Sequence, residues 1–309
     1  MFIAVAALLW GGSATLGKLA FQGAIPFLRV SGPSPIEVIL LAQTRTALAL
    51  LLLAPYLLLR YGKGLLSIPK SDIWKCMAVG TVGIAASNFF YYFAIAKTTV
   101  ATAIIVQYTA PVWVLLYMVS RGLQHASWQR VVAVAMAVVG AVMAIGTLRF
   151  TAAAPFVHLS GLKLNTLGVL AAFGASLSFA FYNVSAGAII ARRHRWAVFT
   201  YALVGAVIFW LIINPPWKVI AAHYTSQQWL FLLIFSITSM LLPFSFYFAG
   251  LQYLDATRAI VTSCLEPVFA ILFAATFAQE SFGWPQVVGM AAVIAGTIII
   301  QMPERPVTS

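Results

Sequence analysis

Two stretches of this chain share one pattern: Ala103-Ile104-Ile105-Val106-Gln107-Tyr108-Thr109-Ala110-Pro111-Val112 and Ala259-Ile260-Val261-Thr262-Ser263-Cys264-Leu265-Glu266-Pro267-Val268. Each begins with Ala-Ile and ends with Pro-Val, and 156 positions separate each residue of the first from its counterpart in the second. The same offset aligns much of 88–140 with 244–296, and it pairs Tyr91 with Tyr247, Trp128 with Trp284, and Gly140 with Gly296. Because Pro, Trp and Gly coincide at one offset, the pattern indicates an internal repeat and not only a shared apolar composition.

The composition of the whole chain is that of a membrane protein. Of its 309 residues, 62% are hydrophobic and only 8% are charged. A soluble domain carries about 25% charged residues, so an ordinary soluble enzyme is excluded. A disordered chain is excluded as well, because disorder requires low hydrophobicity. The apolar residues suffice for roughly nine or ten spanning helices of about 20 residues each.

Apolar runs of spanning length are separated by short polar gaps. The runs are too long for membrane strands and lack alternation, so we expect helices. The first run has no basic leader and no clean cleavage site, so we expect it to be a helix of the mature protein, and a short preceding segment is left open. The ten expected transmembrane helices lie near 2–20, 36–59, 73–95, 99–120, 127–147, 165–190, 196–213, 228–251, 256–278 and 284–302.

The repeat and the helix count together predict an inverted architecture. Each copy contains five helices, and since five is odd, the two copies cross the membrane in opposite directions. We therefore expect an all-α polytopic protein with two inverted five-helix repeats, 1–150 and 161–303, around a central cavity. Such repeats are typical of secondary transporters, whose substrate site lies near the membrane midplane.

The basic residues indicate orientation. The net charge is +12, but the Lys and Arg residues form no long stripe of the kind that binds nucleic acid, so nucleic acid is not an expected partner. Most of them lie in gaps on one side of the membrane. The positive-inside rule predicts that this side is cytoplasmic, so both termini are expected in the cytoplasm. We expect a multi-pass protein of the plasma (inner) membrane. The eleven on that side are Arg60, Lys63, Lys70, Lys75, Arg121, Arg130, Arg192, Arg193, Arg195, Arg258 and Arg305, against Arg29, Lys97, Arg149, Lys163 and Lys218 on the other.

Three motifs carry a family resemblance over about 2–302. They are Trp10-Gly11-Gly12-Ser13, Arg45-Thr46-Ala47-Leu48-Ala49, and Leu265-Glu266-Pro267-Val268 followed by Gln279-Glu280. In these the chain resembles drug/metabolite transporters of the ten-helix EamA type, although Phe179 stands where a Trp is common and Ala110 precedes Pro111 where the second copy has Glu266. The resemblance implies two halves whose first four helices surround a cavity and whose fifth helices brace it. It also implies export or exchange of amino acids, other metabolites or toxic compounds.

Three charged residues within the expected spans are candidates for function, since charge inside hydrocarbon costs about 2.5–3.5 kcal/mol. Glu266 is interpreted either as a substrate ligand or protonatable gate, or as a structural carboxyl bonded to a neighbouring helix. Arg45 is interpreted as a ligand for an anionic group or as a clamp between helices. Lys18 either attracts substrate or extends to the membrane interface.

Polar and aromatic residues in the repeated helices complete the candidate site. A cavity for an amphipathic solute needs flat apolar faces and placed hydrogen-bonding groups; the alternative interpretation is polar contacts between helices. The predicted substrate-binding residues are Trp10, Ser13, Asn88, Tyr91, Gln107, Tyr182, Asn183, Tyr247 and Glu266, with Lys18 and Arg45 as charge partners.

These residues predict a secondary transporter that exports small organic metabolites, such as amino acids or similar amphipathic solutes, by alternating access. A nucleotide-sugar or sugar-phosphate exchanger is the alternative, followed by a membrane enzyme or a non-transporting helper. We expect no cofactor or metal: the histidines lie in gaps without ligand spacing, and Leu19 replaces the Ser/Thr that a phosphate loop at 12–19 would need. The substrate's identity and a monomeric or homodimeric state are left open.

Overall fold

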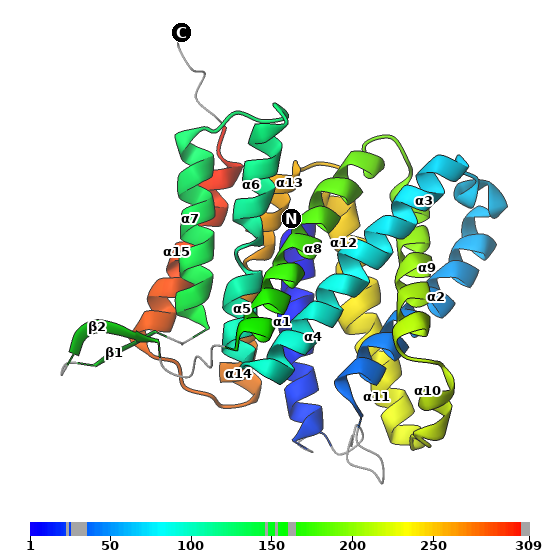
Figure 1. Ribbon diagram of the computed structural model, residues 1–309, viewed down its shortest axis with the longest axis horizontal. Coiled ribbons are helices and arrows are strands. Elements are labelled where there is room, and N and C mark those ends of the chain that lie inside the picture. Colours follow the sequence, from blue (N-terminus) through cyan, green and yellow to red (C-terminus); the bar gives the residue numbers. More distant parts are fainter. Residues whose placement is uncertain (23–24, 26–35, 146–147, 152–153, 160–164, 304–309) are drawn as a thin grey trace.

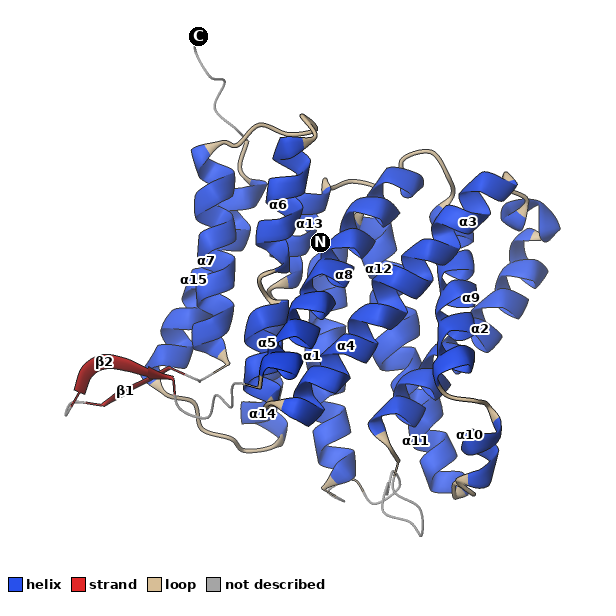
Figure 2. Ribbon diagram, in the orientation of Figure 1, coloured by secondary structure: helices blue, strands red, loops and turns tan. Residues whose placement is uncertain are grey.

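The computed structural model describes residues 1–22, 25, 36–145, 148–151, 154–159 and 165–303. The described chain is a bundle of long helices whose axes are roughly aligned (Figures 1 and 2). Its first five spans are α1 (Phe2–Phe21), α2 (Val38–Tyr61), α3 (Lys70–Ala78) continued through a π-helical segment (Val79–Ala85) into α4 (Ala86–Lys97), the pair α5 (Val100–Gln107) and α6 (Ala110–Ser120), and α7 (Trp128–Ala144). A short helical turn, Lys63–Leu66, links α2 to α3.

The second group of spans follows the same order. It comprises α8 (Thr166–Ile190), α9 (Arg195–Ile213), α11 (Ser226–Ser236) continued through a π-helical segment (Ile237–Leu241) into α12 (Leu242–Gly250), the pair α13 (Ala256–Ser263) and α14 (Glu266–Phe277), and α15 (Trp284–Gln301). The short helix α10 (Trp217–Ala221) lies in the connection between α9 and α11. Within the described residues, nine helical stretches are long and apolar enough to cross a bilayer, and α7, with 17 residues, is a shorter tenth. The prediction of an all-α polytopic membrane protein is confirmed.

A small hairpin stands apart from the bundle between α7 and α8. Its strands β1 (Leu148–Thr151) and β2 (Ala154–Leu159) pair antiparallel (Figure 2). No strand is expected among the spans, and the hairpin lies outside them, around the boundary between the two predicted repeats.

The repeated Pro-Val sequence breaks one span in each half at equivalent positions. α5 ends at Gln107 and α6 begins at Ala110; 156 residues later, α13 ends at Ser263 and α14 begins at Glu266. Proline has no N–H, so Pro111 and Pro267 cannot supply the helical hydrogen bond that the carbonyl four residues earlier would accept. Each proline instead occupies the first turn of a new helix, where an N–H has no partner in any case.

The π-helical segments repeat in the same way. Shifted by 156 positions, Ile237–Leu241 falls on 81–85, inside the first segment, Val79–Ala85. A π-helical turn is rare and widens the helix locally, and it is often found at functional sites. The two halves therefore share their irregularities as well as their apolar runs.

The main helix–helix contacts between the two halves are symmetric: each recurs when both helices are replaced by their equivalents in the other half. α4 packs on α8 as α12 packs on α1, and α5 and α6 pack on α8 as α13 and α14 pack on α1. The two last spans, α7 and α15, pack on each other. There a Cβ at Gly140 would lie 2.8 Å from the carbonyl oxygen of Gly289, and one at Gly296 would lie 2.9 Å from that of Ala133. Those contacts are again related by 156 positions, and they bring the two backbones close together.

The start of α1 and the end of α15 lie on the same side of the bundle (upper side in Figure 1). The connections from α2 to α3, from α6 to α7 and from α8 to α9 lie on this side too (Figure 1). Together with the adjoining helix ends, they carry nine of the 15 described Lys and Arg residues: Arg60, Lys63, Lys70, Lys75, Arg121, Arg130, Arg192, Arg193 and Arg195. Of the basic residues counted from the sequence, Arg29, Lys163 and Arg305 lie outside the described residues.

Candidate functional site

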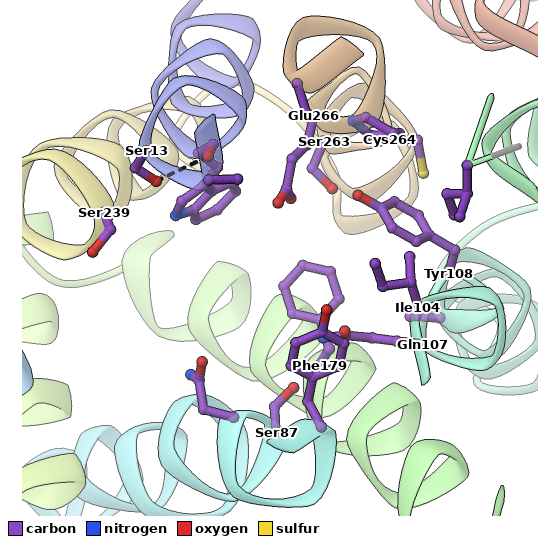
Figure 3. Close-up of a pocket in the computed structure, with 18 of the residues that line it drawn as sticks. Ser13, Ser87, Ile104, Gln107, Tyr108, Phe179, Ser239, Ser263, Cys264 and Glu266 are labelled. Carbon is purple, nitrogen blue, oxygen red and sulfur yellow. Dashed lines mark hydrogen bonds between the residues drawn. The ribbon is translucent and has the colours of Figure 1, made fainter. Parts of the chain in front are cut away.

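A central cavity of about 570 Å³ lies between the two halves of the bundle. Its wall is formed by α1, α2, α4 to α8 and α11 to α15, together with both π-helical segments and residues of the connections. Figure 3 shows side chains from several of these helices pointing into one space, with the Glu266 carboxylate and the Ser263 hydroxyl on one wall and Gln107 and Phe179 on the other.

Most of the residues predicted from the sequence line this cavity. Those that do are Trp10, Ser13, Arg45, Asn88, Tyr91, Gln107, Tyr182 and Glu266. Phe179, where the resemblance led us to expect tryptophan, lines it as well. The structure thus brings together residues that lie as far apart in the sequence as Trp10 and Glu266.

Asn183 and Tyr247 are predicted site residues that do not line the cavity. The Tyr247 hydroxyl donates a hydrogen bond to Oδ1 of Asn183, and Nδ2 of Asn183 donates to the carbonyl of Phe179 at 2.8 Å. Both residues are fully buried. They join α8 to α12 in the packed layer behind the cavity.

Lys18 lies at the end of α1 and is paired rather than directed into the cavity. Its ammonium forms an ion pair with Glu280, in the connection between α14 and α15. Glu280 lines the cavity, as does Gln286 in the first turn of α15. The cavity therefore reaches the side of the bundle opposite to the start of α1.

The guanidinium of Arg45 is held from both halves of the protein. Nη2 donates to Oδ1 of Asn88 on α4 at 2.7 Å, and Nη1 approaches Oγ of Ser239, in the second π-helical segment, at 3.5 Å. The guanidinium carbon lies 6.0 Å from the centre of the Phe235 ring. Arg45 forms no ion pair with a carboxylate among the described residues, and its Nε is buried there without a hydrogen-bond partner. The residue can therefore bind an anionic group without first losing a carboxylate.

Glu266 is the first residue of α14, directly after the break that Pro267 produces. A carboxylate is favoured at a helix N-terminus, where the backbone N–H groups are unpaired. Figure 3 shows the Tyr108 hydroxyl, at the end of α5, pointing toward the Glu266 carboxylate. Tyr108 follows the end of α5 and Glu266 begins α14, so residues from the breaks in both repeated spans face each other across the cavity.

Aromatic rings form the wall toward the side where α1 begins. The Trp10 ring lies 5.2 Å from that of Phe244, and Tyr182 stacks on Phe179 at 5.7 Å with an interplanar angle of 22°. Behind them, Phe199 and Phe248 belong to a buried apolar cluster. These rings offer flat apolar faces to a solute and separate the cavity from that side of the bundle.

Several lining residues were not among the predicted set. Tyr108, Ser263 and Glu280 are the polar ones that matter most for the charges of the cavity. The repeated prolines could have pointed to two of them, because Tyr108 and Ser263 lie within four residues of Pro111 and Pro267, where the helices break. Within the described residues, no group of three or more His, Cys, Asp or Glu side chains converges as a metal site would require.

Comparison with known proteins agrees with this geometry. The model of the EamA-like transporter family matches residues 1–146 and 166–302. The chain is similar to the "Uncharacterized inner membrane transporter YicL" of Salmonella typhimurium, with 22% identity over 312 residues that cover 98% of this chain and 95% of the relative. It is also similar to an "Uncharacterized transporter" of Archaeoglobus fulgidus, with 24% identity over 71% of this chain and 74% of the relative.

The fold has a solved counterpart. A protein of known crystal structure superposes with a TM-score of 0.70 at 20% sequence identity, over 97% of this chain and 96% of the other. At that identity the likeness concerns the fold, whereas the family match covers both halves of the sequence. The chain belongs to the EamA-like transporter family, and it is a membrane transporter.

Proposed function

We propose that the protein is a secondary transporter for small organic metabolites, amino acids or similar amphipathic solutes, which it exports by alternating access. One observation carries the proposal: among the described residues that line the cavity, the single cationic side chain is Arg45, from the first half, and the second half contributes the carboxylate of Glu266. Arg45 would bind a solute carboxylate through its planar fork of N–H donors. Glu266 would bind an ammonium group, and the rings of Trp10 and Tyr182 would cover apolar parts.

The size of the cavity supports a small organic solute. Its volume of about 570 Å³ lies inside the usual range of about 300–1,000 Å³ for small-molecule sites. Arg45 is the one Lys or Arg among the described lining residues. A nucleotide-sugar or sugar-phosphate exchanger would need more cations for its phosphates, so that alternative is weaker.

Alternating access would arise from rocking of the two halves about the cavity. Support comes from the broken spans on either side of Tyr108 and Glu266, which divide two repeated helices at the depth of the cavity. The basic side of the bundle would face the cytoplasm, with both termini there, and the name of the relative YicL favours the inner membrane. The cavity, which reaches the opposite side, would then be open outward. One chain contains the whole cavity, so transport would not require a homodimer, and the partners would be the solute and the bilayer.

Flux into sealed proteoliposomes tests the proposal. Wild-type protein would carry at least one labelled amino acid or related zwitterion faster than empty vesicles. Arg45→Gln and Glu266→Gln would each reduce this flux at least about tenfold, since each removes a charge-assisted hydrogen bond. Arg121→Gln, on the exposed end of α6, is the matched control and would keep the flux. Absence of flux across a panel of zwitterions, or equal flux in Arg45→Gln and wild type, would contradict the proposal.

A further inference from the structure

A second cavity opens on the surface of the bundle that faces lipid. It has a volume of about 330 Å³ and lies between the start of α1, α2, the start of α9 and α12. Most of its lining is apolar, and two of the lining residues, Leu52 and Tyr56, are 37% and 56% exposed. Because these residues belong to a membrane span, their exposed faces contact acyl chains and not water. We call this cavity the α2–α12 groove.

Arg195 is the one charged residue among the described residues that line the α2–α12 groove. Nη1 donates to Oε1 of Gln252 at 2.9 Å, and the guanidinium carbon lies 5.2 Å from the centre of the Trp196 ring. Nε is buried without a hydrogen-bond partner in the described chain. A buried donor without an acceptor is costly, so the site favours a ligand that supplies one.

In the described residues Arg195 forms no ion pair with a carboxylate, whereas Arg130, Arg193 and Arg258 on the same side do. Arg193 pairs with Asp72 at 2.6 Å, and Arg258 lies 3.6 Å from Asp255. Arg195 therefore offers a positive charge without a carboxylate partner at the mouth of an apolar groove. Such a guanidinium binds an anionic oxygen in preference to a neutral one.

The position of Arg195 along the membrane normal matches that of a lipid headgroup. It is the first residue of α9, at the end of a membrane span. The α2–α12 groove extends from there along α12, from Ala249 to Leu242, a rise of about 10 Å at 1.5 Å per residue. A ligand that fills it must be anionic at the interface and apolar for about 10 Å toward the membrane centre.

We propose that the α2–α12 groove is a binding site for an anionic glycerophospholipid. The phosphate lies against Arg195, and one acyl chain occupies the groove beside Leu52, Tyr56 and Phe246. A free phosphate would leave the apolar groove empty, and a zwitterionic lipid would bring a cationic group to the same place. Positively charged residues beside the membrane attract anionic lipids, and the guanidinium of Arg195 stands where that attraction coincides with an apolar groove.

Lipid binding to delipidated, full-length protein tests this site. In neutral detergent, dioleoylphosphatidylglycerol would raise the melting temperature more than dioleoylphosphatidylcholine does, and native mass spectrometry would retain the former preferentially. Arg195→Gln would weaken phosphatidylglycerol binding about tenfold and abolish the preference, whereas the control Arg121→Gln, which removes an exposed charge elsewhere on the same side, would keep it. Equal preference in Arg195→Gln and wild type would overturn the proposal, as would equal stabilisation of wild type by both lipids.

Two further measurements locate the lipid. Ser245→Trp would fill the groove and reduce phosphatidylglycerol binding while leaving Arg195 in place; unchanged binding in this variant would show that the groove is not the site. Soluble glycerol phosphate, which has the charge but no chain, would fail to compete, and effective competition would overturn the role of the groove. If Arg195→Gln does not fold, Arg195→Lys keeps the charge and must keep the lipid preference, with a loss of affinity because the planar fork is gone.

Discussion

Lys18, in the last turn of α1, forms an ion pair with Glu280, which follows α14 and lines the central cavity. The pair joins the first half of the protein to the second at the side that the cavity reaches. Both side chains are 45% exposed, so the pair lies where it can open. Under the proposed rocking of the two halves, this contact would break or rearrange.

Because the Lys18–Glu280 pair is exposed, we expect it to contribute little to stability. A double-mutant cycle of Lys18→Gln and Glu280→Gln on thermal unfolding should give a coupling energy of about 0.2–1 kcal/mol. High salt should reduce that coupling, because it screens exposed charges. A coupling above about 2 kcal/mol, or one that salt leaves unchanged, would mean that the pair is shielded from water.

Tyr108→Phe removes the hydroxyl that points toward the Glu266 carboxylate (Figure 3) and keeps the ring. A polar contact of this kind contributes about 0.5–1.5 kcal/mol when it is made, so its loss should lower the apparent affinity for a transported solute about twofold to tenfold. The measurement is concentration-dependent flux in proteoliposomes. Tyr117→Phe, whose ring is 46% exposed on the neighbouring helix α6, is the control and should leave the affinity unchanged. Equal effects of both variants would speak against a positioning role for Tyr108.

The effects of Tyr247→Phe and Tyr182→Phe on stability can be compared directly. Both tyrosines are fully buried on facing helices, and their ring centres lie 5.5 Å apart. Tyr247→Phe leaves Oδ1 of Asn183 without its donor and should destabilise the protein by about 1–3 kcal/mol. The Tyr182 hydroxyl has no hydrogen-bond partner in the described residues, so Tyr182→Phe should cost little or stabilise. Thermal unfolding in detergent compares the two, and a larger loss in Tyr182→Phe would refute the assignment of the buried pair.

Because α7 and α15 approach each other closely, we expect Gly140→Ala to destabilise the folded protein. The added Cβ would lie 2.8 Å from two backbone atoms of α15, the Gly289 oxygen and the Val293 nitrogen, so the helices must separate. Overpacking of this kind costs about 1–3 kcal/mol.

Gly187→Ala is the matched control for Gly140→Ala, because its nearest neighbour, Cδ2 of Leu251, would lie at an ordinary 3.9 Å. It should be neutral or slightly stabilising, since alanine is the better helix former. Comparable melting temperatures for the two variants would show that α7 and α15 tolerate a wider spacing.

Much of the fold could be predicted from the sequence because its causes are local. Hydrocarbon demands long apolar runs whose backbone bonds are satisfied within the segment, so composition alone indicates the spans. Pro111 and Pro267 each lack the N–H that a helix needs at that position, and this favours a break whatever surrounds them, although Pro55 lies inside α2 without ending it. The symmetric breaks at Gln107 and Ser263 follow from the sequence in the same way.

Part of the site could be predicted for a related reason. Charge is expensive inside hydrocarbon, so Arg45 and Glu266 had to lie in a cavity or be paired, and both line the central cavity. Lys18, by contrast, is paired with Glu280, a partner 262 residues away that no local pattern could indicate. Distance in the sequence carries no information about which spans become neighbours.

What only the tertiary structure decided is which polar residues face the cavity. Tyr182 and Asn183 are consecutive on α8, yet one lines the cavity and the other packs against Tyr247. Tyr91 and Tyr247 are equivalent in the repeat, yet only Tyr91 lines the cavity. The sequence by itself determined the spans, the repeat and the helix breaks, because apolar length and proline act within a segment. The site depended on packing between segments, because a side chain's surroundings are set by the helix that lies opposite.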